Sequence, residues 1–229
     1  MDDERSSWRH GRGAGPVLFV VLSLPFYLND FASIAVGDWR AWLAIDYFAV
    51  KALPLAIVGW MLWRGSLRAD ELGLDARPWT TMIAVFLVVA AAGTLVDQNG
   101  YRLIAELPGY PALGGMPAIS SAAWNWIDLT VGLALVAVVE ELVFRGVMLE
   151  VLRRYTTSTV LIVVVSSLLF GLIHWSGGLH AVVVTSIIGA VFMVGYLAGG
   201  SLLPVMLAHF VINFIDLAGV VPKSLFNLA

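Results

Sequence analysis

Long apolar runs, separated by short polar stretches, dominate the chain from residue 16 onwards. Each run is close to the ~20 residues that an α-helix needs to cross a bilayer. Because a helix satisfies its own backbone polar groups inside lipid, each run predicts a membrane-spanning helix. The runs cover residues 16–36, 41–63, 79–96, 124–149, 158–174, 180–197 and 202–220. The predicted fold class is all-α, a polytopic membrane helical bundle of about seven transmembrane helices, or eight with a missed span.

The polar segments divide the chain into a tail and a bundle. Residues 1–15 are polar and predict a cytoplasmic tail, whereas residues 16–229 predict a single transmembrane bundle. The longest connection, residues 97–123, is rich in Gly and Pro. We expect its portion 101–111 to lie flat on the membrane or to dip into it as a re-entrant segment.

Composition supports a membrane protein and narrows its chemistry. Hydrophobic residues make up 60% of the chain and charged residues 13%, whereas soluble domains average ~45–50% and ~25%. The formal net charge of −3 gives no basis for nucleic-acid binding. The absence of cysteine excludes disulfides, thiol nucleophiles and cysteine-based zinc sites.

The arginine and lysine positions give the bundle an orientation. With seven spans, one side of the membrane receives Arg5, Arg9, Arg12, Arg64, Arg68, Arg77, Arg153 and Arg154. The other side receives Arg40, Arg102 and Lys223. The positive-inside rule then places the N-terminus in the cytoplasm. We expect a multi-pass protein of the cell (inner) membrane.

Three ionisable residues, Glu140, Glu141 and Arg145, interrupt the apolar run 124–149. Inserting each of these charged side chains near the bilayer centre costs about 2.5–3.5 kcal/mol. The charged turn is therefore expected to lie near a membrane–water interface, or to face a protein interior or a water-filled cavity. Glu141 and Arg145 are four residues apart and can pair on one helix face, while Glu140, rotated by about 100°, stays free. The alternative is a buried ion network that only locks helix packing.

Two further runs carry polar residues. His174 ends the fifth run, and His209 and Asn213 lie four residues apart in the seventh. This spacing places His209 and Asn213 on one face, where they could donate to one oxygen or share a metal. Each feature alone has a simpler explanation, such as an interfacial histidine or polar contacts between helices. Together, a Glu, two His and an Asn on three spans favour one shared cavity.

These residues form three motifs, which read Glu140-Glu141-x-x-Phe144-Arg145, Phe170-x-x-x-His174 and His209-x-x-x-Asn213. The set resembles the CAAX-processing and bacteriocin-processing (abortive-infection) family of intramembrane endopeptidases, which includes the Ras-converting CAAX endopeptidase. The resemblance covers residues 124–219, under half of the chain, and the N-terminal half carries no signature of the family.

The resemblance implies hydrolysis of a peptide bond inside a membrane-embedded cavity. Glu140 and His174 would activate a water, while His209 and Asn213 would stabilise the oxyanion and the Glu141–Arg145 pair would support them. In an alternative chemistry, zinc is the cofactor and is held by Glu140, His174, His209 and Asn213. The sequence has no His-Glu-x-x-His pair and leaves this choice open. The expected partners are the lipid bilayer and a peptide or membrane-protein substrate.

Other classes of protein stay open from the sequence. A non-catalytic membrane immunity or scaffold protein would use the same polar cluster for packing or partner binding, and a small transporter would use a proton-carrying Glu pair. Outside the motifs, we expect Asp46 and Asp128 to be interfacial. Lys51 lies deeper and is expected to snorkel or to pair with a carboxylate. Asn29 and Asp30 are not assigned to the site.

Overall fold

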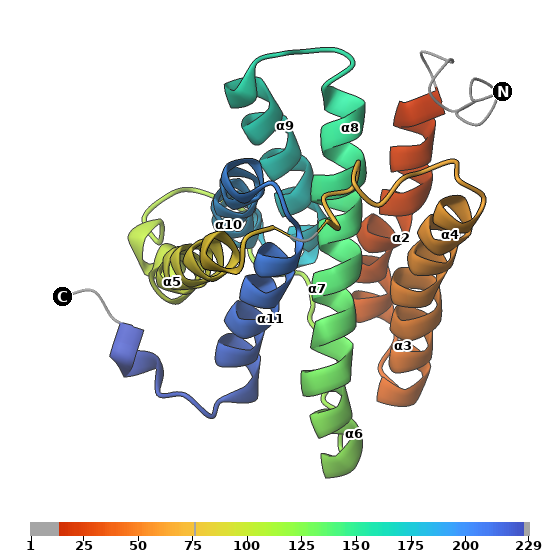
Figure 1. The fold of residues 1–229 in the computed structure, drawn as a ribbon. Coiled ribbons are helices and arrows are strands. Elements are labelled where there is room, and N and C mark those ends of the chain that lie inside the picture. Colours follow the sequence, from red (N-terminus) through yellow and green to blue (C-terminus); the bar gives the residue numbers. More distant parts are fainter. Residues whose placement is uncertain (1–13, 76, 227–229) are drawn as a thin grey trace, which may run out of the picture.

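A computed structural model describes residues 14–75 and 77–226, and the regular structure within them is helical (Figure 1). The N-terminal part contains α2 (Ala14–Ala35), a rod of α3 (Trp39–Ile45), η1 (Asp46–Ala52) and α4 (Leu53–Trp63), and then α5 (Trp79–Leu103). A second rod follows, made of α6 (Ala122–Ile127), η2 (Asp128–Gly132), α7 (Leu133–Glu141), η3 (Leu142–Val147) and α8 (Met148–Leu152). The chain ends with α9 (Thr159–Gly171), η4 (Leu172–Gly177), α10 (Leu179–Gly199), α11 (Leu203–Ala218) and η5 (Lys223–Phe226).

Most of these helices suit a membrane. Within the described part of the chain, five are long and apolar enough to cross a bilayer: Ala14–Ala35, Trp39–Trp63, Trp79–Leu103, Thr159–Gly177 and Leu179–Gly199. Helix α11 is apolar but shorter, and the second rod carries the charged motif. The prediction of an all-α polytopic membrane bundle is confirmed, while the number of seven spans stays a prediction.

The connection after α5 is shorter than the predicted residues 97–123. Helix α5 continues to Leu103, and residues 104–121 form no helix of their own. This connection packs against the turn at η4, where Leu113 N donates to Ser176 O at 2.7 Å and Leu179 N donates to Tyr110 O at 3.1 Å, and its position relative to the membrane stays a prediction. The predicted tail lies outside the described residues, apart from Ala14 and Gly15, which begin α2.

Three π-helical turns interrupt the two rods. In the first rod η1 begins at Asp46, and in the second η2 begins at Asp128 and η3 directly follows Glu141. Such turns insert an extra residue into the helical ladder and are frequent at functional sites. All three therefore lie beside the ionisable residues of the rods.

An aromatic cluster around Phe144 joins α2, η3 and α9. The Phe144 ring is fully buried and makes edge-to-face contacts with four rings at centroid distances of 5.6–6.4 Å, those of Phe19, Phe26, Tyr27 and Phe170. Such pairs contribute about 0.5–1.5 kcal/mol each beyond the area they bury. Phe144 thus anchors the charged turn against α2 and against α9, the helix that precedes the turn with His174.

Candidate active site

A cavity of about 580 Å³ lies among the helices and is lined by residues of both halves of the chain. Four of the residues predicted from the motifs line it: Glu140 on α7, His174 on η4, and His209 and Asn213 on α11. The structure therefore brings the three motifs together at one space.

Glu140 and His174 offer polar atoms without partners. Glu140 is only 7% exposed, and its Oε2 has no hydrogen-bond partner among the described residues. The Nδ1 of His174 is buried and lacks a hydrogen-bond partner there as well. Because an unsatisfied buried polar group costs about 1–3 kcal/mol, a hydrogen bond to a water or a substrate group would stabilise each of these atoms.

Glu141 and Arg145 lie behind the cavity wall, where both are at most 1% exposed. Glu141 Oε1 accepts a hydrogen bond from Arg145 Nη1 at 3.0 Å and lies 2.8 Å from His209 Nδ1. Arg145 Nη2 also donates to the carbonyl of Gly189 at 3.3 Å. A carboxylate only accepts hydrogen bonds, so Nδ1 of His209 carries a proton toward Glu141. This group, the Glu141 cluster, fixes the imidazole with Nε2 at 3.8 Å from Glu140 Oε2.

Phe170 connects the three motifs, a role that sequence reasoning did not assign. The guanidinium carbon of Arg145 lies 4.0 Å from the ring centroid of Phe170. The rings of His174 and His209 approach the same ring at centroid distances of 5.5 and 6.1 Å. The signal in the sequence was its spacing of four residues before His174, which places both on one helix face.

The turn that carries His174 is held by α2. Helix α9 passes into the 3₁₀ turn η4, in which His174 adopts a non-helical conformation with φ −100° and ψ 26°. The next residues are anchored because Trp175 Nε1 donates to Tyr27 O at 3.0 Å and Ser176 N donates to Asp30 Oδ2 at 2.6 Å. Asp30 also lines the cavity, while a role for it in the site stays untested.

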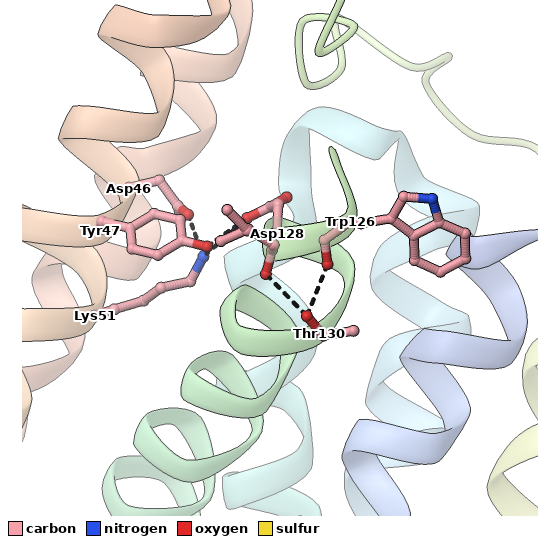
Figure 2. A network of polar contacts seen from close by, with 7 residues as sticks. Asp46, Tyr47, Lys51, Trp126, Asp128 and Thr130 are labelled. Atoms are coloured by element: carbon pink, nitrogen blue, oxygen red, sulfur yellow. Dashed lines mark hydrogen bonds and ion pairs between the residues drawn. The ribbon is translucent and has the colours of Figure 1, made fainter. Parts of the chain in front are cut away.

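Figure 2 shows a second charged group, the Lys51 cluster of Asp46, Tyr47, Lys51 and Asp128. Its three charged members line the same cavity. Lys51 forms a close ion pair with Asp46 and lies 3.9 Å from Asp128 Oδ1, while Tyr47 Oη donates to Asp128 Oδ1 at 3.1 Å. The expectation of a paired Lys51 is confirmed. Asp46 is buried among protein side chains, and its interfacial depth in the membrane stays a prediction. Sequence position indicates depth along a span but not which side chains meet across helices.

The zinc alternative can be tested on the arrangement of donors. Among the described residues, no group of three or more His, Asp or Glu side chains is arranged to hold a metal ion. The hydrogen bond from His209 Nδ1 to Glu141 leaves Nε2 available as a ligand and is common for metal-ligating histidines, so the test depends on the number of converging ligands. Catalytic zinc sites use three protein ligands, so these residues, as they are placed, do not fit a zinc site, and no step below passes through a metal.

The fold and the cavity define a class: a multi-pass helical membrane protein with a polar cavity lined by carboxylate, imidazole and amide groups. Comparison with known proteins adds the family. Residues 122–215 match the family of type II CAAX prenyl endopeptidase Rce1-like proteins. The match covers all three motifs but less than half of the chain, and it confirms the resemblance to the CAAX-processing proteases. No curated protein and no solved structure matches the chain.

Proposed function

We propose that this protein is an intramembrane endopeptidase that hydrolyses a peptide bond of a peptide or membrane-protein substrate. The observation that carries the proposal is the meeting of Glu140, His174, His209 and Asn213 at one cavity. The match to a protease family supports the same reaction class. A location in the cell membrane with a cytoplasmic N-terminus stays part of the proposal.

The attacking group is a water held between Glu140 and His174. The Glu140 carboxylate accepts a proton from this water as its oxygen bonds to the scissile carbonyl carbon. The carbonyl electrons move to oxygen, and His209 and Asn213 donate hydrogen bonds to the resulting oxyanion. When the tetrahedral intermediate collapses, the C–N bond breaks and Glu140 returns its proton to the leaving amine.

Charge balance supports a donor role for His209. Glu140 in the cavity wall and Glu141 behind it carry two negative charges, and Arg145 carries one positive charge, so a protonated His209 makes the group neutral. An unbalanced charge is costly in a poorly solvated interior. With Nδ1–H directed at Glu141, a protonated His209 presents Nε2–H to the cavity. Glu141 and Arg145 then act as positioning residues, because they hold the imidazole rather than touch the substrate.

The direct test compares peptide termini in membrane fractions of cells that produce the wild-type protein or Glu140→Gln. Removal of the general base should reduce cleavage by about 10²–10⁴-fold, so wild-type termini disappear in the variant. Glu150→Gln is a matched control. Glu150 pairs with Arg153 at an N–O distance of 3.6 Å, and neither residue lines the cavity. Identical termini from wild type and Glu140→Gln, with both proteins folded, would overturn the proposal.

The same assay separates a glutamate-dependent protease from a metalloprotease. From the donor arrangement, we expect cleavage by the purified protein to change less than about twofold when 1,10-phenanthroline is added, and we expect no stoichiometric zinc in metal analysis. Loss of cleavage with the chelator, restored by zinc, would show instead that the ligands rearrange around a metal.

A further inference from the structure

The charges that line the cavity are unequal. Among the described residues, two lining groups are positive, the ammonium of Lys51 and the imidazole of His209 that the proposed mechanism protonates. Six are carboxylates: Asp30, Asp46, Asp97, Asp128, Asp216 and Glu140. Coulomb interactions are strong where solvent is scarce. A cavity of this composition therefore disfavours an acidic peptide and attracts a basic one.

Within this lining, the Lys51 cluster leaves one carboxylate only partly compensated. Lys51 is 4% exposed and is committed to Asp46, and its ammonium also lies 4.3 Å from the centroid of the Tyr47 ring. Asp128 is 3.9 Å from the ammonium, and its side chain is 18% exposed. Two carboxylates and one ammonium carry a net charge of −1, and Asp128 is the most exposed of these three cavity-lining side chains.

A second observation indicates that the cavity receives a ligand. Glu140 lines the same space, is 7% exposed, and carries an Oε2 without a hydrogen-bond partner. Glu140 and Asp128 lie on one rod, twelve residues apart. At 1.5 Å per residue they are separated by about 18 Å, which an extended peptide spans in five or six residues at about 3.3 Å each.

We propose that Asp128 forms a specificity subsite for a lysine or arginine side chain of the substrate. The inference rests on the proposed peptidase function and adds the class of substrate to it. The side chain of a lysine or arginine can bridge part of the distance of about 18 Å, so fewer peptide residues than five or six are needed. The basic residue therefore lies about three to six positions from the scissile bond. Lys51 and Tyr47 hold Asp128 in place, and the cationic side chain of the substrate neutralises the remaining negative charge of the Lys51 cluster.

The test uses the purified full-length protein in detergent micelles with a library of randomised decapeptides, whose new termini are read by mass spectrometry. Lysine and arginine should be enriched at one position three to six residues from the cut. Three peptides with lysine, norleucine or glutamate at that position then give the specificity ratio. We expect kcat/KM for lysine to exceed that for norleucine by about tenfold, and glutamate to be the poorest.

The matched variants are Asp128→Asn and Asp70→Asn. Asparagine at 128 still accepts the Tyr47 hydrogen bond and leaves the Lys51–Asp46 pair intact, so the fold is kept, and the lysine-to-norleucine ratio should fall to about one. Asp70 pairs with Arg68 in an exposed loop outside the cavity, so Asp70→Asn should keep the wild-type ratio.

Each outcome has a defined meaning. Cleavage without a basic preference, or a preference for glutamate, would overturn the subsite while leaving the peptidase function standing. A basic preference that persists in folded Asp128→Asn would overturn the role of Asp128. The measurement on wild type with the three peptides does not depend on any variant folding. Cleavage of no library peptide would overturn the proposed function, and the subsite with it.

Discussion

The cavity has two charged clusters in its walls, and they differ in how they are built. The Glu141 cluster is enclosed: Glu141 and Arg145 have almost no exposure and opposite charges, and a protonated His209 would balance the charge of Glu140. The Lys51 cluster borders the open space, joins η1 to η2 and retains a net negative charge. The first is therefore suited to fixing a side chain for catalysis, and the second to receiving a charged group.

The clusters also differ in sequence context. The Glu141 cluster lies within residues 122–215, which match the endopeptidase family. Of the Lys51 cluster, only Asp128 lies in that segment, while Asp46, Tyr47 and Lys51 come from the N-terminal half. The N-terminal rod therefore contributes one part of the cavity wall that lies outside the shared segment, next to residues of α2 and α5. Under the two proposals above, the shared segment would provide the chemistry and the rod would adapt the cavity to a substrate.

The largest effect on stability is expected for Arg145→Met. The substitution leaves Glu141 enclosed without its guanidinium, and breaking a buried pair in this way costs about 3–5 kcal/mol. The contact of Arg145 with the Phe170 ring is lost as well. Thermal or denaturant unfolding in detergent would measure the loss.

The control for this variant is Arg153→Met. Arg153 is exposed and pairs with Glu150 at 3.6 Å, and exposed pairs contribute about 0–1 kcal/mol. If both substitutions destabilised the protein equally, the Glu141 cluster would not be the enclosed pair that the comparison requires.

The contrast between the clusters explains how much could be predicted from the sequence. The helical bundle follows from the apolar runs, and the Glu141–Arg145 pair follows from helix periodicity, because its partners are four residues apart. The bond from His209 to Glu141 joins residues 68 positions apart, and the contact of Lys51 with Asp128 is equally non-local. The periodicity of a helix or a strand does not predict contacts between residues so far apart in the sequence.

Other parts of the site had only partial signals. Phe170 lay within a motif, but its contacts with Arg145, His174 and His209 depend on how three helices pack. Asp30 gave no pattern at all, because its partner is a backbone amide in a 3₁₀ turn. The roles of the motif residues in catalysis stay predictions, which the variants above would test.

A smaller loss of stability is expected for Lys51→Met. The ion pair with Asp46 is broken, but the cluster borders the cavity and water can reach Asp128. We expect a cost of about 2–3 kcal/mol, below that of a fully enclosed pair. The double variant Asp46→Asn/Lys51→Met leaves no unpaired charge at these two positions. Its loss of stability should be smaller, by at least about 1 kcal/mol, than the sum of the losses in the two single variants. Purely additive losses would mean that the two side chains do not interact.

The smallest effect is expected for Gly132→Ala, which tests how closely η1 and η2 approach. A methyl group on Gly132 would lie 2.6 Å from Tyr47 Oη and would also meet Asp128 Oδ1. Overpacking of this kind costs about 1–3 kcal/mol, partly offset by about 0.8–1 kcal/mol of helix propensity. The matched control is Gly59→Ala in α4, where a methyl group would meet nothing within 4 Å, so stability should rise slightly.

Because the methyl group displaces Tyr47 and Asp128, Gly132→Ala should also lower the lysine preference of cleavage while Gly59→Ala preserves it. Equal stability and equal preference in the two variants would show that the Lys51 cluster tolerates displacement and does not set specificity through a fixed position of Asp128.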